Sequence, residues 1–138
     1  MNAEFIDANV LIYAHDESAG RKREVARELL RRLVVNRQAA SSVQVAGEFF
    51  VIATRKIKTP LSAKNASMIL ADMSGWIIHS PNLEDAQAAA AMAARSQIRY
   101  WDALVIRSAQ VIGASILWSE DLQDGGQFGE VTIRNPFR

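Results

Sequence analysis

The sequence contains no cysteine and only two histidines, His15 and His79, among its 138 residues. Without cysteine the chain has no disulfide framework, no thiolate zinc site, no iron–sulfur cluster and no cysteine nucleophile. Two histidines are too few for a multi-histidine metal site. Any metal site in this chain is therefore expected to use oxygen ligands.

Long hydrophobic runs are also missing. The longest run, residues 88–94, is far shorter than the ~20 apolar residues that a membrane-spanning helix needs. The first residues carry neither the basic region nor the apolar stretch of a secretory signal peptide. We therefore expect a soluble, cytoplasmic protein that does not associate with a membrane.

Charge of one sign is not in excess, because 16 Lys and Arg residues balance 15 Asp and Glu residues to a net charge of +1. A broadly basic, nucleic-acid-coating surface is therefore not indicated, but the balance says nothing about how the charges are arranged. The composition, 49% hydrophobic and 22% charged, is that of an ordinary folded protein. The length and the lack of linkers predict one domain over residues 1–138.

Apolar runs alternate with helical patterns along the chain, which is typical of an α/β fold with a mostly parallel central sheet flanked by helices. We predict short strands at residues 5–6, 38–41, 76–78, 115–118 and 131–133. Helices are predicted over residues 9–14, 21–36, 62–73, 83–96 and 102–112. A sixth helix, ending near residue 55, is predicted to open with a capping box formed by Ser41 and Gln44.

Four acidic residues fall at the junctions of this pattern rather than on solvated helix faces. Asp7 ends the first strand, Asp102 opens a helix, and Asp121 follows the strand at residues 115–118. Glu48 lies among apolar neighbours on its helix, where an unpaired carboxylate is costly. Strand ends and the helix starts after them share one edge of a parallel sheet, so the four carboxylates are expected to converge. Taken singly, the three aspartates also fit a helix-capping role.

Clustered carboxylates repel one another and raise one another's pKa values, so such a cluster requires a cation. Oxygen ligands favour the hard ions Mg²⁺ and Mn²⁺. Sites of this kind clamp phosphate oxygens and activate a water molecule for in-line attack, which removes the need for a histidine base. The sequence therefore predicts phosphodiester hydrolysis.

Five short motifs carry a family resemblance. The sequence reads Phe-Ile-Asp-Ala-Asn at 5–9, Gln-Val-Ala-Gly-Glu-Phe at 44–49, Tyr-Trp-Asp-Ala-Leu at 100–104, Ser-Glu-Asp-Leu at 119–122 and Asn-Pro-Phe at 135–137. In this order the motifs resemble the PIN-domain ribonucleases, and most closely the VapC-type toxins of bacterial toxin–antitoxin pairs. The resemblance spans almost the whole chain. It implies endonucleolytic cleavage of RNA by an acidic Mg²⁺ or Mn²⁺ site whose catalytic and metal-binding residues are Asp7, Glu48, Asp102 and Asp121.

The resemblance also assigns supporting positions and partners. Asn9 and Ser119 match polar positions that orient a carboxylate or water, although a turn asparagine and a strand-end serine explain them equally well. Asp124 either assists the metal or only begins the turn at Gly125. Gly47, within a helix, suggests close backbone packing. The family further implies an antitoxin protein as partner and a homodimer.

The basic residues are less informative. Seven of the 16 fall between residues 21 and 37, where a solvated helix face is the simplest interpretation. We hypothesise that Arg21, Lys22 and Arg23 contact RNA phosphates beside the acidic site. The three tryptophans are expected in the core, and the two histidines in turns without a functional role; the tryptophans are Trp76, Trp101 and Trp118.

The prediction is therefore a metal-dependent endoribonuclease that acts as a toxin. One alternative is a catalytically silent PIN-like module that binds RNA or a partner without cutting. Another is a phosphoacceptor receiver domain, which gathers acidic residues at strand ends in a similar fold. A receiver domain normally has paired acids after the first strand and a lysine near the last strand. This chain has Asp7-Ala8-Asn9 at the first position and no lysine after Lys64.

Overall fold

The computed structural model describes residues 2–138; Met1, the first residue of the predicted domain, lies outside the described residues. A six-stranded sheet with the order β3-β2-β1-β4-β6-β5 forms the centre of the molecule. All neighbouring strands pair in parallel except β5 and β6. The strands are β1 (Glu4–Ile6), β2 (Ala39–Ser42), β3 (Ile77–His79), β4 (Ile116–Trp118), β5 (Gln127–Phe128) and β6 (Val131–Arg134).

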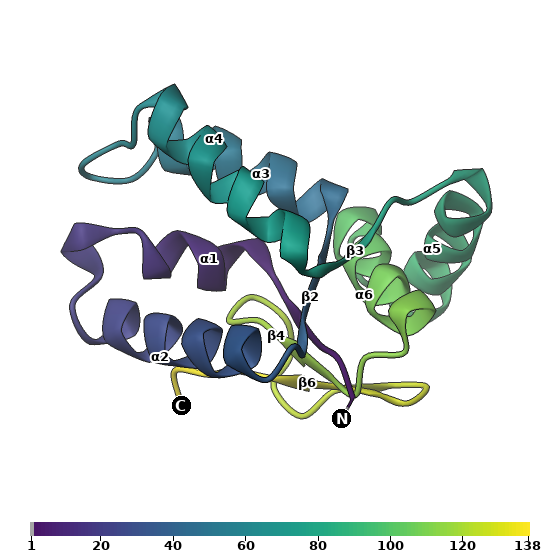
Figure 1. Ribbon diagram of the computed structural model, residues 1–138. Helices are drawn as coiled ribbons and strands as arrows, with labels where there is room; N and C mark the ends of the chain where they lie inside the picture. Colours follow the sequence, from purple (N-terminus) through teal and green to yellow (C-terminus); the bar gives the residue numbers. More distant parts are fainter. Residues whose placement is uncertain (1) are drawn as a thin grey trace.

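Within residues 2–138, six α-helices surround the sheet: α1 (Ala8–Ala14), α2 (Arg21–Val35), α3 (Val43–Arg55), α4 (Ala63–Asp72), α5 (Leu83–Ser96) and α6 (Tyr100–Ile112). Short 3-10 helices follow α1 and α4, at Glu17–Ala19 and Met73–Gly75. Figure 1 shows α1 and α2 side by side on one side of the sheet, α5 and α6 on the other, and α3 and α4 beyond the end of β2. The predicted α/β fold with a mostly parallel, helix-flanked sheet is confirmed.

The central strands are buried because helices cover both faces of the sheet. Every residue of β1 and of β2 is buried. Phe5 and Ile6 in β1, Leu117 in β4 and Phe49 in α3 have no exposed surface. A parallel sheet covered on both faces favours continuous apolar strands. The strand ends that carry the predicted site residues are thereby fixed in a rigid core.

The predicted starts of α3 and α6 are wrong by one and two residues. Ser42, not Ser41, is the N-cap of α3, where its hydroxyl accepts the N–H of Val45 at 3.2 Å. Ser41 belongs to β2, and its hydroxyl donates to the carbonyl of Ile6 at 2.9 Å. The predicted capping box is absent because Ser41 stays in the strand. The last helix, α6, begins at Tyr100 and not at Asp102, so that Asp102 lies within its first turn.

Strand β5 is the one strand of residues 2–138 that the sequence pattern did not predict. It has two residues and pairs antiparallel with β6 across the turn at Gly129, which has a φ of +61°. A left-handed backbone at this position favours glycine. A two-residue strand is too short to show a period-two pattern, so no periodic signal marked it in the sequence.

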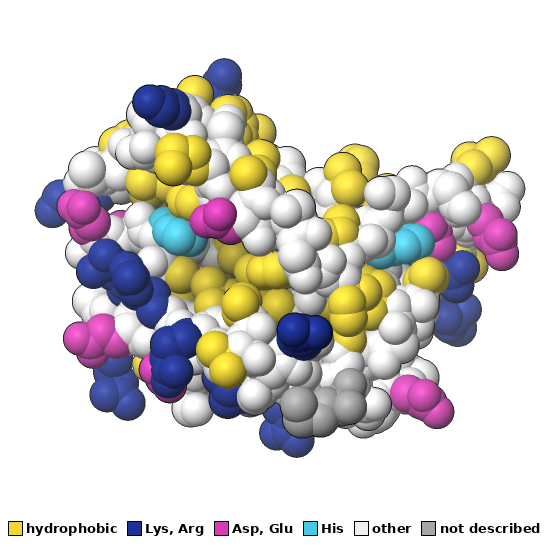
Figure 2. Space-filling model, viewed as in Figure 1, with side chains coloured by type: hydrophobic (Ala, Val, Ile, Leu, Met, Phe, Trp, Pro, Cys, Tyr) yellow, Lys and Arg dark blue, Asp and Glu magenta, His cyan; other side chains and the backbone are white. Residues whose placement is uncertain are grey.

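The surface in Figure 2 is hollowed between the α1–α2 pair and the α3–α4 pair, and hydrophobic side chains form the floor of the hollow. Lys and Arg side chains gather over α2 on the same face. None of the helices within residues 2–138 combines the length and the hydropathy that crossing a membrane requires.

A buried ion-pair cluster joins α5 and α6 to the end of β3. Asp85 is 3% exposed and accepts the Nε of Arg107 at 2.9 Å, while His79 contacts its other oxygen at 2.8 Å. The N–H of Asn82 completes a capping box at 3.0 Å. His79 was expected in a turn without a role, and the structure instead places it at the end of β3 as a partner of Asp85. This cluster fixes the helix that carries Asp102.

We expect Asp85→Asn to lower the free energy of unfolding. The N–H of Asn82, with Arg107 and His79, lowers the pKa of Asp85 from 3.8 to about 2, against the effect of burial. The charged carboxylate therefore stabilises the fold above about pH 4, and this stabilisation is lost as the pH falls through about 2. Urea unfolding at pH 7 should show a loss of about 2 kcal/mol.

The matched control for this variant is Glu84→Gln, which neutralises the exposed neighbour of Asp85 in the same helical turn. The control should change the free energy of unfolding by less than about 0.5 kcal/mol. Equal stability of Asp85→Asn and the native protein at pH 7 would contradict the role given to the cluster.

Candidate active site

Asp7 connects the sheet to the site, because it follows β1 directly and caps α1. Its Oδ1 accepts the N–H of Ala8 at 2.7 Å, and its Oδ2 accepts the hydroxyl of Ser119 at 2.8 Å. The residue is only 8% exposed. Asp7 therefore satisfies the helix start, as a capping residue does, and also presents a carboxylate at the end of β1.

Asn9 and Ser119 link Asp7 to Asp121. The side-chain amide of Asn9 donates to the hydroxyl of Ser119 and to Oδ2 of Asp121, both at 3.2 Å. Its carbonyl oxygen accepts the N–H of Glu120 at 3.0 Å. Ser119 is fully buried and accepts the N–H of Asp121 at 3.2 Å. These two residues hold the loop after β4 against the start of α1.

Glu48 and Asp102 approach the same space from the opposite side. Glu48 lies on α3 and accepts a hydrogen bond from Gln44 at 2.9 Å. Asp102, on α6, is paired with Arg99, which donates from Nε to Oδ2 at 3.2 Å. Neither Asp102 nor Asp121 caps a helix, because Arg99 is the N-cap of α6 and no helix follows Asp121.

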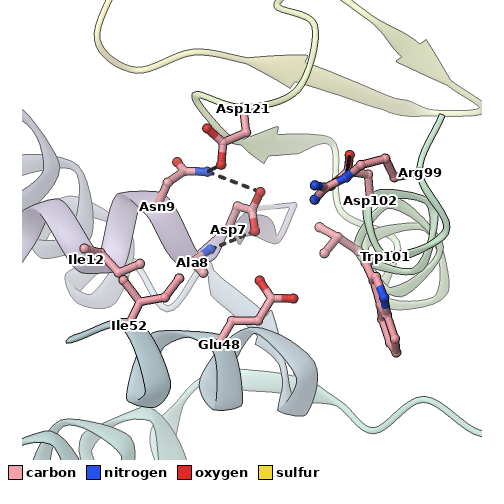
Figure 3. A pocket seen from close by; sticks show the side chains of 11 residues that line it. Asp7, Ala8, Asn9, Ile12, Glu48, Ile52, Arg99, Trp101, Asp102 and Asp121 are labelled. Carbon is pink, nitrogen blue, oxygen red and sulfur yellow. Dashed lines mark hydrogen bonds and ion pairs between the residues drawn. The ribbon is translucent and has the colours of Figure 1, made fainter. Parts of the chain in front are cut away.

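All four predicted carboxylates line one cavity of about 100 Å³. In Figure 3 the carboxylates of Asp7 and Glu48 face each other, Asp121 lies beside Asn9, and Asp102 lies across the space with Arg99. The cavity is lined by Asp7, Ala8, Asn9, Ile12, Glu48, Ile52, Arg99, Trp101, Asp102, Val105 and Asp121. The lining residues come from the end of β1 and the start of α1, from the middle of α3, from the start of α6 and from the loop after β4.

The electrostatics of the cavity are unfavourable for an ionised Asp7. Burial raises the pKa of Asp7 from 3.8 to about 6, in spite of the hydrogen bonds from Ser119 and Ala8. The charges of Glu48 and Asp121 raise this pKa further. A buried carboxylate beside two other acids is stabilised in its charged form by a bound cation.

The donor set fits a hard divalent cation, since it consists of carboxylate oxygens with the amide of Asn9 and the hydroxyl of Ser119 nearby. As the side chains lie, no group of three or more His, Asp or Glu residues in residues 2–138 is arranged to hold a metal ion. Hydrogen bonds and an ion pair among the lining side chains account for this arrangement. Arg99 occupies both oxygens of Asp102, and Asn9 contacts both Asp7 and Asp121.

Glu120 was not identified from the sequence, although it stands between Ser119 and Asp121. Its two oxygens accept the hydroxyl of Tyr13 and the ammonium of Lys22, each at 2.6 Å. Lys22 also lies 4.9 Å from the ring centroid of Tyr13. The three side chains fasten the loop after β4 to α1 and α2. The sequence carries no signal for this role beyond the place of Glu120 between Ser119 and Asp121.

The hypothesis that Arg21, Lys22 and Arg23 contact RNA stays a prediction. The structure commits Lys22 to Glu120 and therefore leaves it less able to bind a phosphate. Arg21 lies outside the carboxylate cavity, beside Phe137. The Nε of Arg23 is buried without a hydrogen-bond partner among the described residues.

The structure corrects the expectations for Trp101 and Gly47, and it narrows the one for Asp124. Trp101 is 59% exposed at the rim of the cavity, so it is not a core residue. Gly47 has no atom within 4 Å of the position where a Cβ would stand, and it borders an open groove along α3 instead of a close backbone contact. Asp124 does not line the cavity; its side chain accepts the N–H of Asn135 at 2.8 Å.

A model of the PIN domain family matches residues 5–123. No curated protein matches the chain in sequence. The match to the PIN domain family favours the nuclease prediction over the receiver-domain alternative.

Solved structures of bacterial toxins and toxin–antitoxin complexes share the fold. A toxin–antitoxin complex from Klebsiella pneumoniae is 19% identical with a TM-score of 0.72, covering 97% of this chain and 98% of that chain. VapC20 from Mycobacterium tuberculosis, a toxin that cleaves the sarcin–ricin loop, is 17% identical with a TM-score of 0.70, covering 94% and 99%. DNA-bound VapBC from Salmonella typhimurium is 15% identical with a TM-score of 0.66, covering 99% of each chain.

The substitution Asp7→Asn, which replaces a buried carboxylate by an amide, should stabilise the protein when no metal is bound. Between about pH 4 and 6 folded Asp7 keeps a proton that the unfolded chain has released, so the free energy of unfolding falls as the pH rises through this range. Asp7→Asn removes this pH-dependent destabilisation and should raise the free energy of unfolding at pH 7 by about 3 kcal/mol. The measurement is urea unfolding in the presence of a chelator.

The same comparison at pH 4 should show almost no difference, because Asp7 is then neutral in the native protein as well. Asp121→Asn, which changes an exposed acid of the same cavity, serves as the control and should have a much smaller effect at pH 7. A native protein as stable as Asp7→Asn at pH 7 would show that Asp7 is not under strain.

Proposed function

Since the chain belongs to the PIN domain family, we propose that it is a divalent-metal-dependent endoribonuclease and the toxin of a toxin–antitoxin pair. The observation that carries the proposal is the cavity in which Asp7, Glu48 and two further carboxylates meet at one edge of the sheet. The cavity contains no thiol and no imidazole, and its acids fit a hard ion better than any other common group.

Asp7, Glu48, Asp102 and Asp121 would hold Mg²⁺ or Mn²⁺. When bound, such an ion supplies Lewis-acid polarisation of a phosphate oxygen and lowers the pKa of a water molecule. The burial of Asp7 supports its role as a ligand, because its carboxylate is costly to ionise there without a cation.

The remaining polar residues of the cavity position the ligands. Asn9 holds Asp121 by its amide and orients the backbone of Glu120 by its carbonyl oxygen. Ser119 donates to Asp7 and leaves the other carboxylate oxygen to the start of α1. Preorganised ligands lower the cost of assembling a charged site, and loss of such supporting partners commonly weakens metal binding 10- to 100-fold.

The partners belong to the proposal as well. One protein of the same fold occurs in a complex described as a toxin–antitoxin complex, and two others, VapBC and FitAB, are bound to DNA. The hydrophobic hollow between the two helix pairs offers this chain a surface for an antitoxin (Figure 2). RNA is the proposed substrate, and a homodimer is proposed from the family and from the frequency of two-fold oligomers.

The catalytic prediction uses Asp102→Asn, which keeps the shape of the side chain and removes its charge. We expect the variant to fold and to lose at least ~100-fold in Mn²⁺-dependent cleavage of RNA, as is typical when a charged group of the site is lost. The measurement is single-turnover cleavage of total cellular RNA with mapping of the ends. A chelator should abolish cleavage by the native protein.

Asp72→Asn, an exposed acid at the end of α4, is the matched control and should cut at the native rate. Retained metal-dependent cleavage by Asp102→Asn would remove Asp102 from the active site. Binding of RNA without any cleavage by the native protein would favour the catalytically silent alternative.

The toxin role is tested in cells. Induced expression of the native chain in a bacterial host should slow growth, because RNA cleavage limits protein synthesis. Expression of Asp102→Asn to the same level should leave the growth rate close to that of the empty-vector strain. Growth curves with immunoblots of both proteins make the comparison, and equal growth inhibition by the two chains would contradict a toxic nuclease activity.

A further inference from the structure

Arg99 occupies an unusual position at the entrance to α6. It is the N-cap residue of this helix but makes no side-chain capping hydrogen bond. Its side chain turns instead to Asp102, with Nε 3.2 Å from Oδ2 and Nη2 3.3 Å from Oδ1. Figure 3 shows the guanidinium directed into the space that Asp7, Glu48 and Asp121 also face.

Charge distinguishes Arg99 from every other residue of the cavity. Of the described residues that line it, Arg99 is the one basic side chain, opposite four acids. The charges of Asp102, Asp121 and Glu48 all act on the guanidinium. Arg99 is therefore the resident cation of a site that otherwise collects negative charge.

The ion pair between Arg99 and Asp102 is weak enough for Arg99 to leave this partner for another. Its side chain is 78% exposed, and the ion pair with Asp102 is the only one it makes in residues 2–138. Exposed ion pairs contribute little because water competes with both partners. The guanidinium can therefore leave Asp102 without unfolding any part of α6.

A divalent ion and Arg99 compete for the same carboxylate. The guanidinium contacts both oxygens of Asp102, so an ion that binds this residue meets a positive charge at short range. Once released, the guanidinium stays at the mouth of the cavity, where the planar fork of its N–H groups matches two oxygens of a phosphate. Lys22, which also lies close to the loop of Asp121, is less exposed than Arg99, at 46%, and pairs with Glu120 at 2.6 Å.

We propose that Arg99 is an exchangeable cation and substrate-binding residue: it pairs with Asp102 in the metal-free site, yields this carboxylate to the divalent ion, and then binds a phosphate of the RNA. The inference rests on the proposed function of the same site. It assigns to one residue two effects of opposite sign, since Arg99 weakens metal binding and strengthens RNA binding. A residue with a purely structural role would not change metal binding and RNA binding in opposite directions.

The first test measures Mn²⁺ binding without RNA, from the electron paramagnetic resonance signal of free Mn²⁺. Arg99→Gln should bind Mn²⁺ about two- to fivefold more tightly than the native protein, the range expected when a competing exposed ion pair is removed. Arg95→Gln removes the same charge from the exposed end of α5, outside the cavity, and should leave the affinity unchanged.

The second test measures the binding of a short fluorescent RNA of mixed sequence by chains that also carry Asp121→Asn to prevent cleavage. With saturating Mn²⁺, Arg99→Gln should weaken binding about fivefold and reduce the slope of log affinity against log salt by about 0.7, the contribution of one phosphate contact. With a chelator the loss should be smaller, because Arg99 then remains with Asp102. Arg99→Lys should restore part of the affinity.

The outcomes separate this inference from the proposed function. A native protein that binds no Mn²⁺ overturns both. A native protein that binds Mn²⁺ and cuts RNA, beside an Arg99→Gln variant with unchanged or weaker Mn²⁺ binding, overturns the inference alone. Tighter Mn²⁺ binding with undiminished RNA binding also overturns it, because Arg99 would then act only as a counter-charge.

Discussion

The structure depends on one electrostatic constraint, which is the burial of the Asp7 carboxylate next to Glu48 and Asp121. Burial and the two like charges raise the pKa of Asp7 to about 6. The ionised carboxylate is therefore unfavourable, and a bound cation would stabilise it. A fold selected only for stability would avoid this arrangement. The surrounding residues reduce the cost: Ser119 and the N–H of Ala8 hydrogen bond to the carboxylate.

The rest of the molecule keeps these charges in place. The loop after β4 is held by Asn9 from one side and by the Glu120 pair with Lys22 from the other. On the opposite wall, the Asp85 cluster anchors α6, whose first turn carries Asp102. Preorganisation of this kind matters because charged groups that must reorganise on binding lose much of their effect. The site is therefore supported by polar contacts between elements that are distant in the sequence.

Much of the fold was predictable because the elements follow local rules. The amphipathic pattern predicted α2 over 21–36, and the structure gives Arg21–Val35. Strand β5 and the true N-cap of α3 were missed, since two residues carry no periodicity and two adjacent serines fit a cap equally well. Trp101 was expected in the core because it is a large apolar residue that adjoins the helix of Asp102, yet it is exposed. Burial depends on the packing of neighbouring elements, which residue type does not specify.

The sequence by itself determined the oxygen-only chemistry of the site, since it has no cysteine and few histidines, and it determined the order of the four acids along an alternating α/β pattern. Only the tertiary structure decided which partners the acidic side chains in and around the site have. It joined Asp7 to Ser119 across 112 positions of the chain and committed Lys22 to Glu120 across 98 positions. It also turned Arg99 toward the acids. Contacts between such distant residues follow from strand order and helix packing, because hydrogen bonds and ion pairs depend on distances that only the folded chain fixes.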